Sequence, residues 1–324
     1  MKKTRTPHIL LISVIVLQFV LAELIELSNI NFTVTQAIII SQVSILIPFA
    51  IYCLISRKNP LKVIRFKKIN MLSAFMAFLV AIFSYPVVIF LNLVSMLFVE
   101  NAVADIIPSV LQQGLGTGLL LMALLPAVVE ETIFRGTLYN TYSKYNPLAG
   151  VLLSAVLFGF MHMNFNQIPY AIYMGIVAAL LLEACDSIVA PMILHFTLNG
   201  SSLVLAFVTG SLQGDIEVPQ VTDVRAALIE SFRITAQDMN LPLTEAEINA
   251  MGPIIIIGCL ISVGIFALMA LAFVLVFIYI TFCVNKRKPK EVFRRPVLGQ
   301  KERFVDLWVI VFMLYAIYEC IKSL

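Results

Sequence analysis

The stretch that decides the fold runs from residue 115 to residue 143 and reads LGTGLLLMALLPAVVEETIFRGTLYNTYS. It is long and apolar enough to cross a bilayer as a helix, which takes about 20 residues. It nevertheless carries two adjacent carboxylates, Glu130 and Glu131, and the guanidinium of Arg135. Ionisable side chains inside a membrane helix are costly, and by default they indicate a functional site.

The composition of the whole chain repeats the membrane signal. Of its 324 residues 60% are hydrophobic and 13% are charged, whereas a soluble domain is closer to half apolar and a quarter charged. Backbone groups in lipid must bond to one another, so we predict an all-α, polytopic transmembrane helical bundle of about eight or nine spans. The candidate spans are 9–29, 34–56, 71–98, 115–143, 148–163, 168–184, 187–208, 252–284 and 305–322.

The chain divides into four parts. One of them, residues 209–250, is rich in polar residues and lies between long apolar runs. Within that polar segment, AALIESF and LTEAEINAM predict short helices that lie over the outer face of the bundle. The parts are a three-helix N-terminal transmembrane part (1–114), a helical core (115–208), a polar extracytoplasmic segment (209–250) and a C-terminal transmembrane part (251–324).

Basic residues predict the orientation in the membrane. The N-terminal residues 1–5 and the loops 57–68 and 286–303 hold 17 of the 22 Lys and Arg residues. The segment 209–250 instead carries seven acidic residues and two arginines. The positive-inside rule therefore places the N-terminus and both basic loops in the cytoplasm, and the acidic segment outside.

The expected surroundings and partners follow from the same features. Basic loops beside membrane spans fit anionic lipid headgroups, so we expect membrane lipids and no nucleic acid as partners. The five cysteines show no CxxC spacing and predict neither a disulfide framework nor a thiolate metal site. Few glycines and prolines, with loops rich in Lys, Ile and Asn, suggest a bacterial plasma membrane.

The two adjacent glutamates have different helical neighbours. Glu131 and Arg135 are four residues apart and share one helix face, with the acid first, which is the favourable order for an ion pair. Glu130 lies about 100° further round the helix and has no partner at that spacing. The pattern fits a paired acid beside a free one, or a structural salt bridge with a spare acid lining a pore.

A histidine lies at the same distance from a turn as the free glutamate. The turn signal KYNP centres near Asn146, with Glu130 16 residues before it and His162 16 residues after it. In an antiparallel helix pair both would stand about 24 Å from the turn, facing one pocket. The other interpretation of His162 is a structural histidine at a helix end.

A second histidine and an asparagine share a face of a later helix. His195 and Asn199 are four residues apart, one turn after Pro191, and both can donate hydrogen bonds. Such donors can stabilise an oxyanion. The alternative is hydrogen bonding between helices, which is common for Asn and His in membranes. Other polar residues lie mostly near span ends, and no chemistry is assigned to them: Glu23, Glu26, Gln42, Asn92, Glu183, Asp186, Asp306 and Glu319.

Together these side chains can hydrolyse a peptide bond. Glu130 and His162 can share the deprotonation of a water, and no cofactor is required for this. The alternative is a zinc site with Glu130, His162 and His195 as ligands and an open position for water. The short-range zinc-protease pattern HExxH is absent, so no short-range motif indicates a metal.

Three short motifs, EETIFRG (130–136), FGFMH (158–162) and HFTLN (195–199), occur in this order on successive predicted helices. They resemble the motifs of the CPBP family of intramembrane proteases, which comprises CaaX prenyl endopeptidases and bacteriocin-processing or Abi proteins. The resemblance covers roughly residues 115–205. It implies an intramembrane endopeptidase whose substrate is a peptide or protein near the membrane surface, and whose cavity opens to the cytosol.

The resemblance also implies roles for single residues. Glu130 and His162 would activate the water, His195 and Asn199 would form the oxyanion hole, and Glu131 with Arg135 would orient the site. It implies glutamate-dependent hydrolysis without metal, with zinc as the alternative. Two other functions stay open: a transporter or proton relay, and a non-enzymatic immunity or scaffold protein with the same fold.

Overall fold

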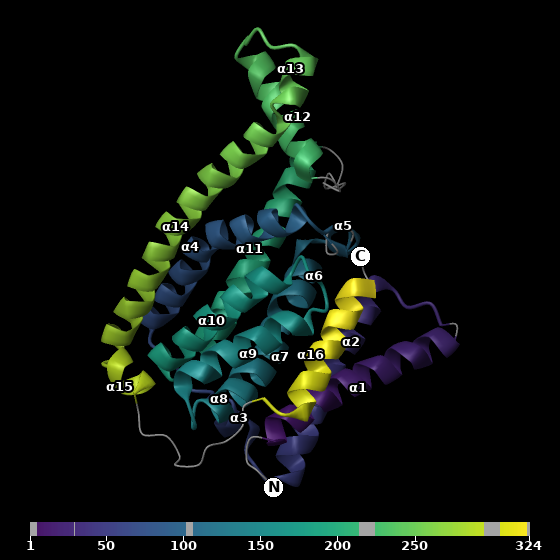
Figure 1. Cartoon of the computed structure of the whole chain (residues 1–324). Coiled ribbons are helices and arrows are strands. Elements are labelled where there is room, and N and C mark those ends of the chain that lie inside the picture. Colours follow the sequence, from purple (N-terminus) through teal and green to yellow (C-terminus); the bar gives the residue numbers. More distant parts are fainter. Residues whose placement is uncertain (1–4, 29, 102–105, 214–223, 295–304, 323–324) are drawn as a thin grey trace.

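The computed structural model describes residues 5–28, 30–101, 106–213, 224–294 and 305–322. These residues form helices and connecting turns without a strand, which confirms the predicted all-α bundle (Figure 1). The elements are α1 (Arg5–Ser28), α2 (Val34–Ile55), α3 (Pro60–Val63), α4 (Met71–Met96), α5 (Ile106–Leu111), α6 (Leu115–Gly118), the π-helix η1 (Leu119–Leu124), α7 (Leu125–Ile133), the π-helix η2 (Phe134–Tyr139), α8 (Asn140–Tyr142), α9 (Pro147–Met161), α10 (Ile168–Cys185), α11 (Val189–Gln213), α12 (Val224–Asp238), α13 (Glu245–Ala250), α14 (Gly252–Val284), α15 (Pro289–Phe293) and α16 (Leu307–Lys322).

Seven stretches of helix in the described residues are long and apolar enough to cross a membrane, so the chain is an integral membrane protein. One of them is the continuous rod from α6 to α8, which contains the stretch quoted above. Two of the nine predicted spans form helices with fewer than the roughly 17–25 residues that a membrane crossing takes. Helix α9 has 15 residues and extends about 22 Å, less than the roughly 30 Å of a hydrocarbon core, and α16 has 16 residues.

One end of the bundle, here called the basic end, gathers the loop 56–70, the turns 143–146 and 186–188, and residues 285–288. Arg65 and Arg287 both bind Glu183, at 2.8 Å and 3.2 Å between nitrogen and oxygen. Lys67 pairs with Asp186. In the sequence, Glu183 is one of the polar residues that lie mostly near span ends, and no chemistry is assigned to it. It is fully buried, because the two loops fold over the last turn of α10.

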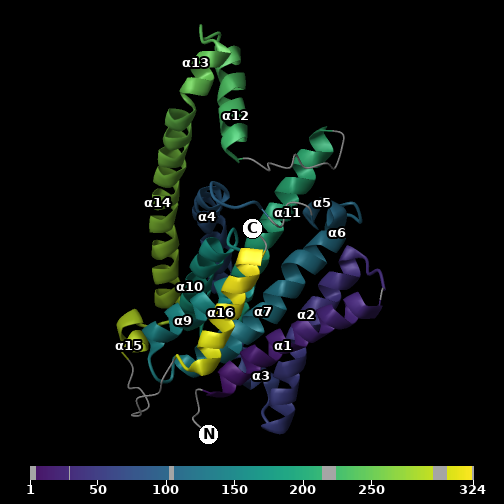
Figure 2. The same cartoon turned by 45° about the vertical axis from the view of Figure 1, so that its right-hand side comes forward.

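The opposite end, here called the far end, carries the polar segment. Both predicted short helices are present as α12 and α13, and Thr244 caps α13. Its backbone N–H donates to Glu247 at 2.8 Å, which holds the pKa of this carboxyl below its usual range. The two helices do not lie over the bundle as predicted. They extend beyond it from the end of α14 (Figures 1 and 2).

Small residues let the central helices approach closely. Helices α9 and α10 pack so tightly that a Cβ at Gly175 would lie 2.7 Å from the Cα of Ala155 and 3.3 Å from Nη2 of Arg135. Real Cβ atoms do not come this close to other atoms, and a backbone atom on the neighbouring helix has little freedom to move. Gly175 thus sets the distance between the two helices around the buried arginine.

We expect the substitution Gly175→Ala to separate α9 from α10. Overpacking of this kind costs about 2 kcal/mol in the free energy of unfolding. Gly258→Ala, in α14, is the control because its Cβ would meet nothing within 4 Å. Thermal unfolding in detergent should show a lower midpoint for Gly175→Ala than for Gly258→Ala. Equal midpoints would contradict close packing at Gly175.

Candidate active site

A fully buried ion pair lies at the centre of the site. Nη1 of Arg135 donates to Oε1 of Glu131 at 3.1 Å, and both side chains have 0% exposure. The contact that the four-residue spacing predicts is therefore present. The guanidinium also stacks on the ring of Phe158, 4.2 Å from its centroid. A buried charge needs such compensation, because it has lost its hydration.

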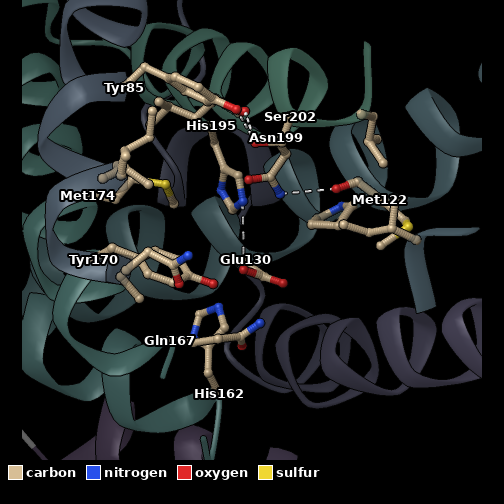
Figure 3. A pocket seen from close by; sticks show the side chains of 18 of the residues that line it. Tyr85, Met122, Glu130, His162, Gln167, Tyr170, Met174, His195, Asn199 and Ser202 are labelled. Carbon is tan, nitrogen blue, oxygen red and sulfur yellow. Dashed lines mark hydrogen bonds and ion pairs between the residues drawn. The ribbon is translucent and has the colours of Figure 1, made fainter. Parts of the chain in front are cut away.

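His195 joins this ion pair from α11. Its Nδ1 lies 2.9 Å from Oε1 of Glu131, and the ring is almost completely buried. A carboxylate can only accept, so Nδ1 carries the hydrogen and Nε2 points the other way. Nε2 lies 4.0 Å from Oε2 of Glu130 (Figure 3). The imidazole thus stands between the two adjacent glutamates.

Glu130 is the more accessible of the two acids. Its side chain is 16% exposed and lines a cavity. Gln42 of α2 donates to its Oε1 at 3.3 Å, which anchors one oxygen. Sequence reasoning assigned Gln42 no role. An amide in the middle of the apolar run QAIIISQVSILIPF was the signal that could have found it.

His162 faces the same cavity from the end of α9. The predicted turn is present, with Asn146 capping α9 by accepting from the N–H of Ala149 at 3.1 Å. Nδ1 of His162 donates to the carbonyl of Phe158 at 3.0 Å, so in the neutral ring Nε2 is the acceptor. Among the contacts of the described residues, no hydrogen bond or ion pair joins His162 to Glu130 (Figure 3).

Phe158 holds the parts of the site in place. Its ring packs edge-on against His162 and His195, with centroids 5.0 Å and 6.1 Å away, while Arg135 covers one face. Its carbonyl accepts from His162, so one residue contacts three of the predicted site residues. The sequence motif from Phe158 to His162 therefore includes a packing residue as well as a polar one.

Asn199 makes a hydrogen bond between helices, which confirms the alternative interpretation of this residue. Its Nδ2 donates to the carbonyl of Met122 in η1 at 3.0 Å. Pro126 lies four residues after Met122 and has no N–H, so it cannot make the α-helical bond to the carbonyl to which Asn199 donates. One of the two Nδ2 hydrogens is thus used within the helix bundle, and the other is left for the cavity.

The cavity has a volume of about 360 Å³, within the range of small-ligand sites. Glu130, His162, His195 and Asn199 all contribute to its wall, while Glu131 and Arg135 lie behind it. Sequence reasoning missed Tyr85 and Ser202, whose hydroxyls are 3.2 Å apart across the cavity wall (Figure 3). The other lining residues are Val88, Ile89, Asn92, Asn101, Ile107, Met122, Pro126, Phe158, Gln167, Tyr170, Ala171, Met174, Leu198 and Leu203.

The positions of the alternative zinc ligands can be compared with what a metal site requires. In the described part of the chain, no three His, Cys, Asp or Glu side chains gather in a way that could hold a metal ion. His195 directs Nδ1 to Glu131 and Nε2 towards Glu130, while His162 uses Nδ1 on a carbonyl. Glu130, His162 and His195 nevertheless all line the same cavity.

Comparison with known proteins agrees with the three motifs. Residues 112–201 match the family model described as Type II CAAX prenyl endopeptidase Rce1-like, which confirms the resemblance for this segment. The match contains all six candidate residues and supports a membrane-embedded peptide hydrolase. No curated protein and no solved structure matches the chain.

The two adjacent glutamates should differ in their effect on stability. Glu131→Gln leaves the fully buried Arg135 without a counter-ion, so we expect a loss of about 3 kcal/mol in the free energy of unfolding. Glu130→Gln removes a partly exposed acid and should change it by less than about 1 kcal/mol. Thermal unfolding of both variants in detergent measures the difference. Equal losses would contradict the assignment of Glu131 as the partner of Arg135.

Proposed function

We propose that the chain is an intramembrane endopeptidase, in which Glu130 and His162 activate the water that hydrolyses a peptide bond. The observation that carries this proposal is the pair of acceptors on one cavity. The carboxylate of Glu130 and Nε2 of His162 border the same space and are not bonded to each other, which leaves room for a water between them. Two acceptors can bind both hydrogens of that water and orient its lone pair.

Hydrolysis would proceed by transfer of one proton and attack of the water oxygen. As the new C–O bond forms at the substrate carbonyl, Glu130 takes the proton, with His162 accepting the second hydrogen bond. The carbonyl oxygen becomes an oxyanion. The proton then passes to the amide nitrogen, the C–N bond breaks, and a carboxylic acid and an amine result. General base catalysis of this kind contributes 10²–10⁴-fold to a rate.

His195 and Asn199 are the proposed oxyanion donors. Asn199 has one Nδ2 hydrogen left after its bond to Met122. His195 already gives its Nδ1 hydrogen to Glu131, so Nε2 can donate only if the ring is an imidazolium. Glu130, whose Oε2 lies 4.0 Å from Nε2, would balance that charge, because Glu131 is already paired with Arg135. Each donor removed from an oxyanion hole costs on the order of 3 kcal/mol in the barrier.

Glu131 and Arg135 are proposed as positioning residues. They do not line the cavity, yet Glu131 sets the hydrogen on Nδ1 of His195 and Arg135 holds Phe158 against both imidazoles. A proton relay could use the chain from Glu131 through His195 to Glu130. The match of the motif-bearing segment to a peptidase family favours hydrolysis over such a relay, and over a scaffold without chemistry.

We expect Glu130→Gln and His162→Ala to lower cleavage on the order of a thousandfold while the protein still folds. Comparative peptidomics of cells that carry each variant or the unmodified protein measures the effect and identifies the substrate. Glu23→Gln is the control, because Glu23 is an exposed glutamate near the end of α1. Unchanged peptide patterns in both site variants would favour the scaffold function.

We expect cleavage by the purified protein to continue in the presence of a metal chelator. The water is bound by a carboxylate and an imidazole in the proposed mechanism, so no step depends on a metal. Metal analysis of the same preparation, beside a chelator titration of peptide cleavage, tests this. Stoichiometric zinc together with loss of cleavage on chelation would support the zinc alternative.

A further inference from the structure

The cavity and the basic loops lie in opposite halves of the bundle. On α4, α9 and α10 the cavity touches only the half remote from the basic end. Its outermost described lining residues, Asn101, Ile107 and Gln167, belong to connections at the far end. No lining residue comes from the described loops of the basic end, which are 56–70, 143–146, 186–188 and 285–288.

A polar connection inside the membrane thickness supports water at this end. Helix α9 extends about 22 Å from the basic end and α10 about 27 Å, so the connection 162–167 lies short of a 30 Å hydrocarbon core. Its sequence is HMNFNQ, and Asn166 donates to Asn92 of α4 at 2.9 Å. Irregular backbone at membrane depth requires burial in protein or contact with a water-filled cavity. The far-end half of the cavity meets this requirement.

The wall of the cavity suits an uncharged peptide segment. Its described lining residues include no lysine or arginine, and amides and hydroxyls supply most of the polar groups. A free C-terminal carboxylate beside the scissile bond would meet Glu130 without a lysine or arginine to balance it. Ile89 lines the cavity and is an exposed apolar residue, so an apolar side chain of a substrate can contact it from the lipid side.

The charges place the two ends on different sides of the membrane. The basic end carries Arg57, Lys58 and Lys62 beside the paired Arg65 and Lys67. The far-end segment 209–250 has seven acidic residues against two arginines. The positive-inside rule therefore puts the basic end in the cytoplasm and the mouth of the cavity outside.

We propose that the substrate enters from the extracytoplasmic side, as an exported or membrane-spanning polypeptide cut at an internal bond within the outer half of the bilayer. This inference builds on the proposed function and names its substrate class. It differs from the cytosolic opening that the family resemblance implies. The physical reason is that Glu130 and His162 line a cavity whose described residues on α4, α9 and α10 all lie in the half of the bundle remote from the basic end.

The side of entry can be measured without knowing the substrate. Ser202→Cys puts a thiol on the cavity wall, and Ser56→Cys puts one at the basic end with the same change of atom. Intact cells or spheroplasts, and inverted vesicles, are treated with a membrane-impermeant charged maleimide. Peptide mass mapping then locates each modified cysteine, so the five native cysteines can stay.

We expect Ser202→Cys to react from the outside and Ser56→Cys only in inverted vesicles. Gln167→Cys, nearer the mouth, is a second cavity variant in case Ser202→Cys does not fold. Reaction of the cavity thiols only in inverted vesicles, together with Ser56→Cys, would overturn the proposal. Failure of folded cavity variants to react from either side would overturn it too, because the cavity would then be closed to water.

The substrate class is tested separately by the peptides that disappear in Glu130→Gln cells. We expect these peptides to come from extracytoplasmic or membrane-spanning segments. C-terminal tripeptides of cytosolic proteins would overturn the proposed substrate. If no peptide changes, the proposed protease function fails, whereas the labelling still decides on which side the cavity opens.

Discussion

The site depends on one buried charge, the guanidinium of Arg135. It has no exposure to solvent and is compensated by Glu131 on one side and by the ring of Phe158 on another. These two contacts fix further residues, because Glu131 also binds His195 and the carbonyl of Phe158 binds His162. Arg135 therefore orients both imidazoles through Glu131 and Phe158, although Arg135 itself does not line the cavity. Gly175 leaves the space in which this arginine can lie.

The adjacent glutamates show how a helix divides similar residues between different tasks. A step of about 100° turns Glu131 towards the interior of the bundle and Glu130 towards the cavity. One carboxylate is enclosed by two donors, whereas the other keeps 16% of its side chain exposed and shares the cavity with His162. Both donors bind Oε1 of Glu131, whereas Glu130 lines the cavity.

A shortened helix is the structural basis for the proposed side of entry. Because α9 ends about 22 Å from the basic end, His162 and the polar connection after it lie within the membrane thickness. Pro126 has a related effect in the rod that carries Glu130. It cannot make the α-helical bond to the carbonyl of Met122, and Asn199 of α11 donates to that carbonyl. Defects in regular helix thus bring polar groups to one cavity.

The sequence by itself determined the helical class, most of the spans, the Glu131–Arg135 pair and the turn at Asn146, since each follows from local spacing or hydropathy. Equal distances from that turn also brought Glu130 and His162 to one cavity. Only the tertiary structure decided that Gln42 anchors Glu130, that Asn199 serves Met122 and that Glu183 is buried between two arginines. The reason is physical: these contacts join residues far apart in the chain, and helical periodicity contains no information about which helices become neighbours.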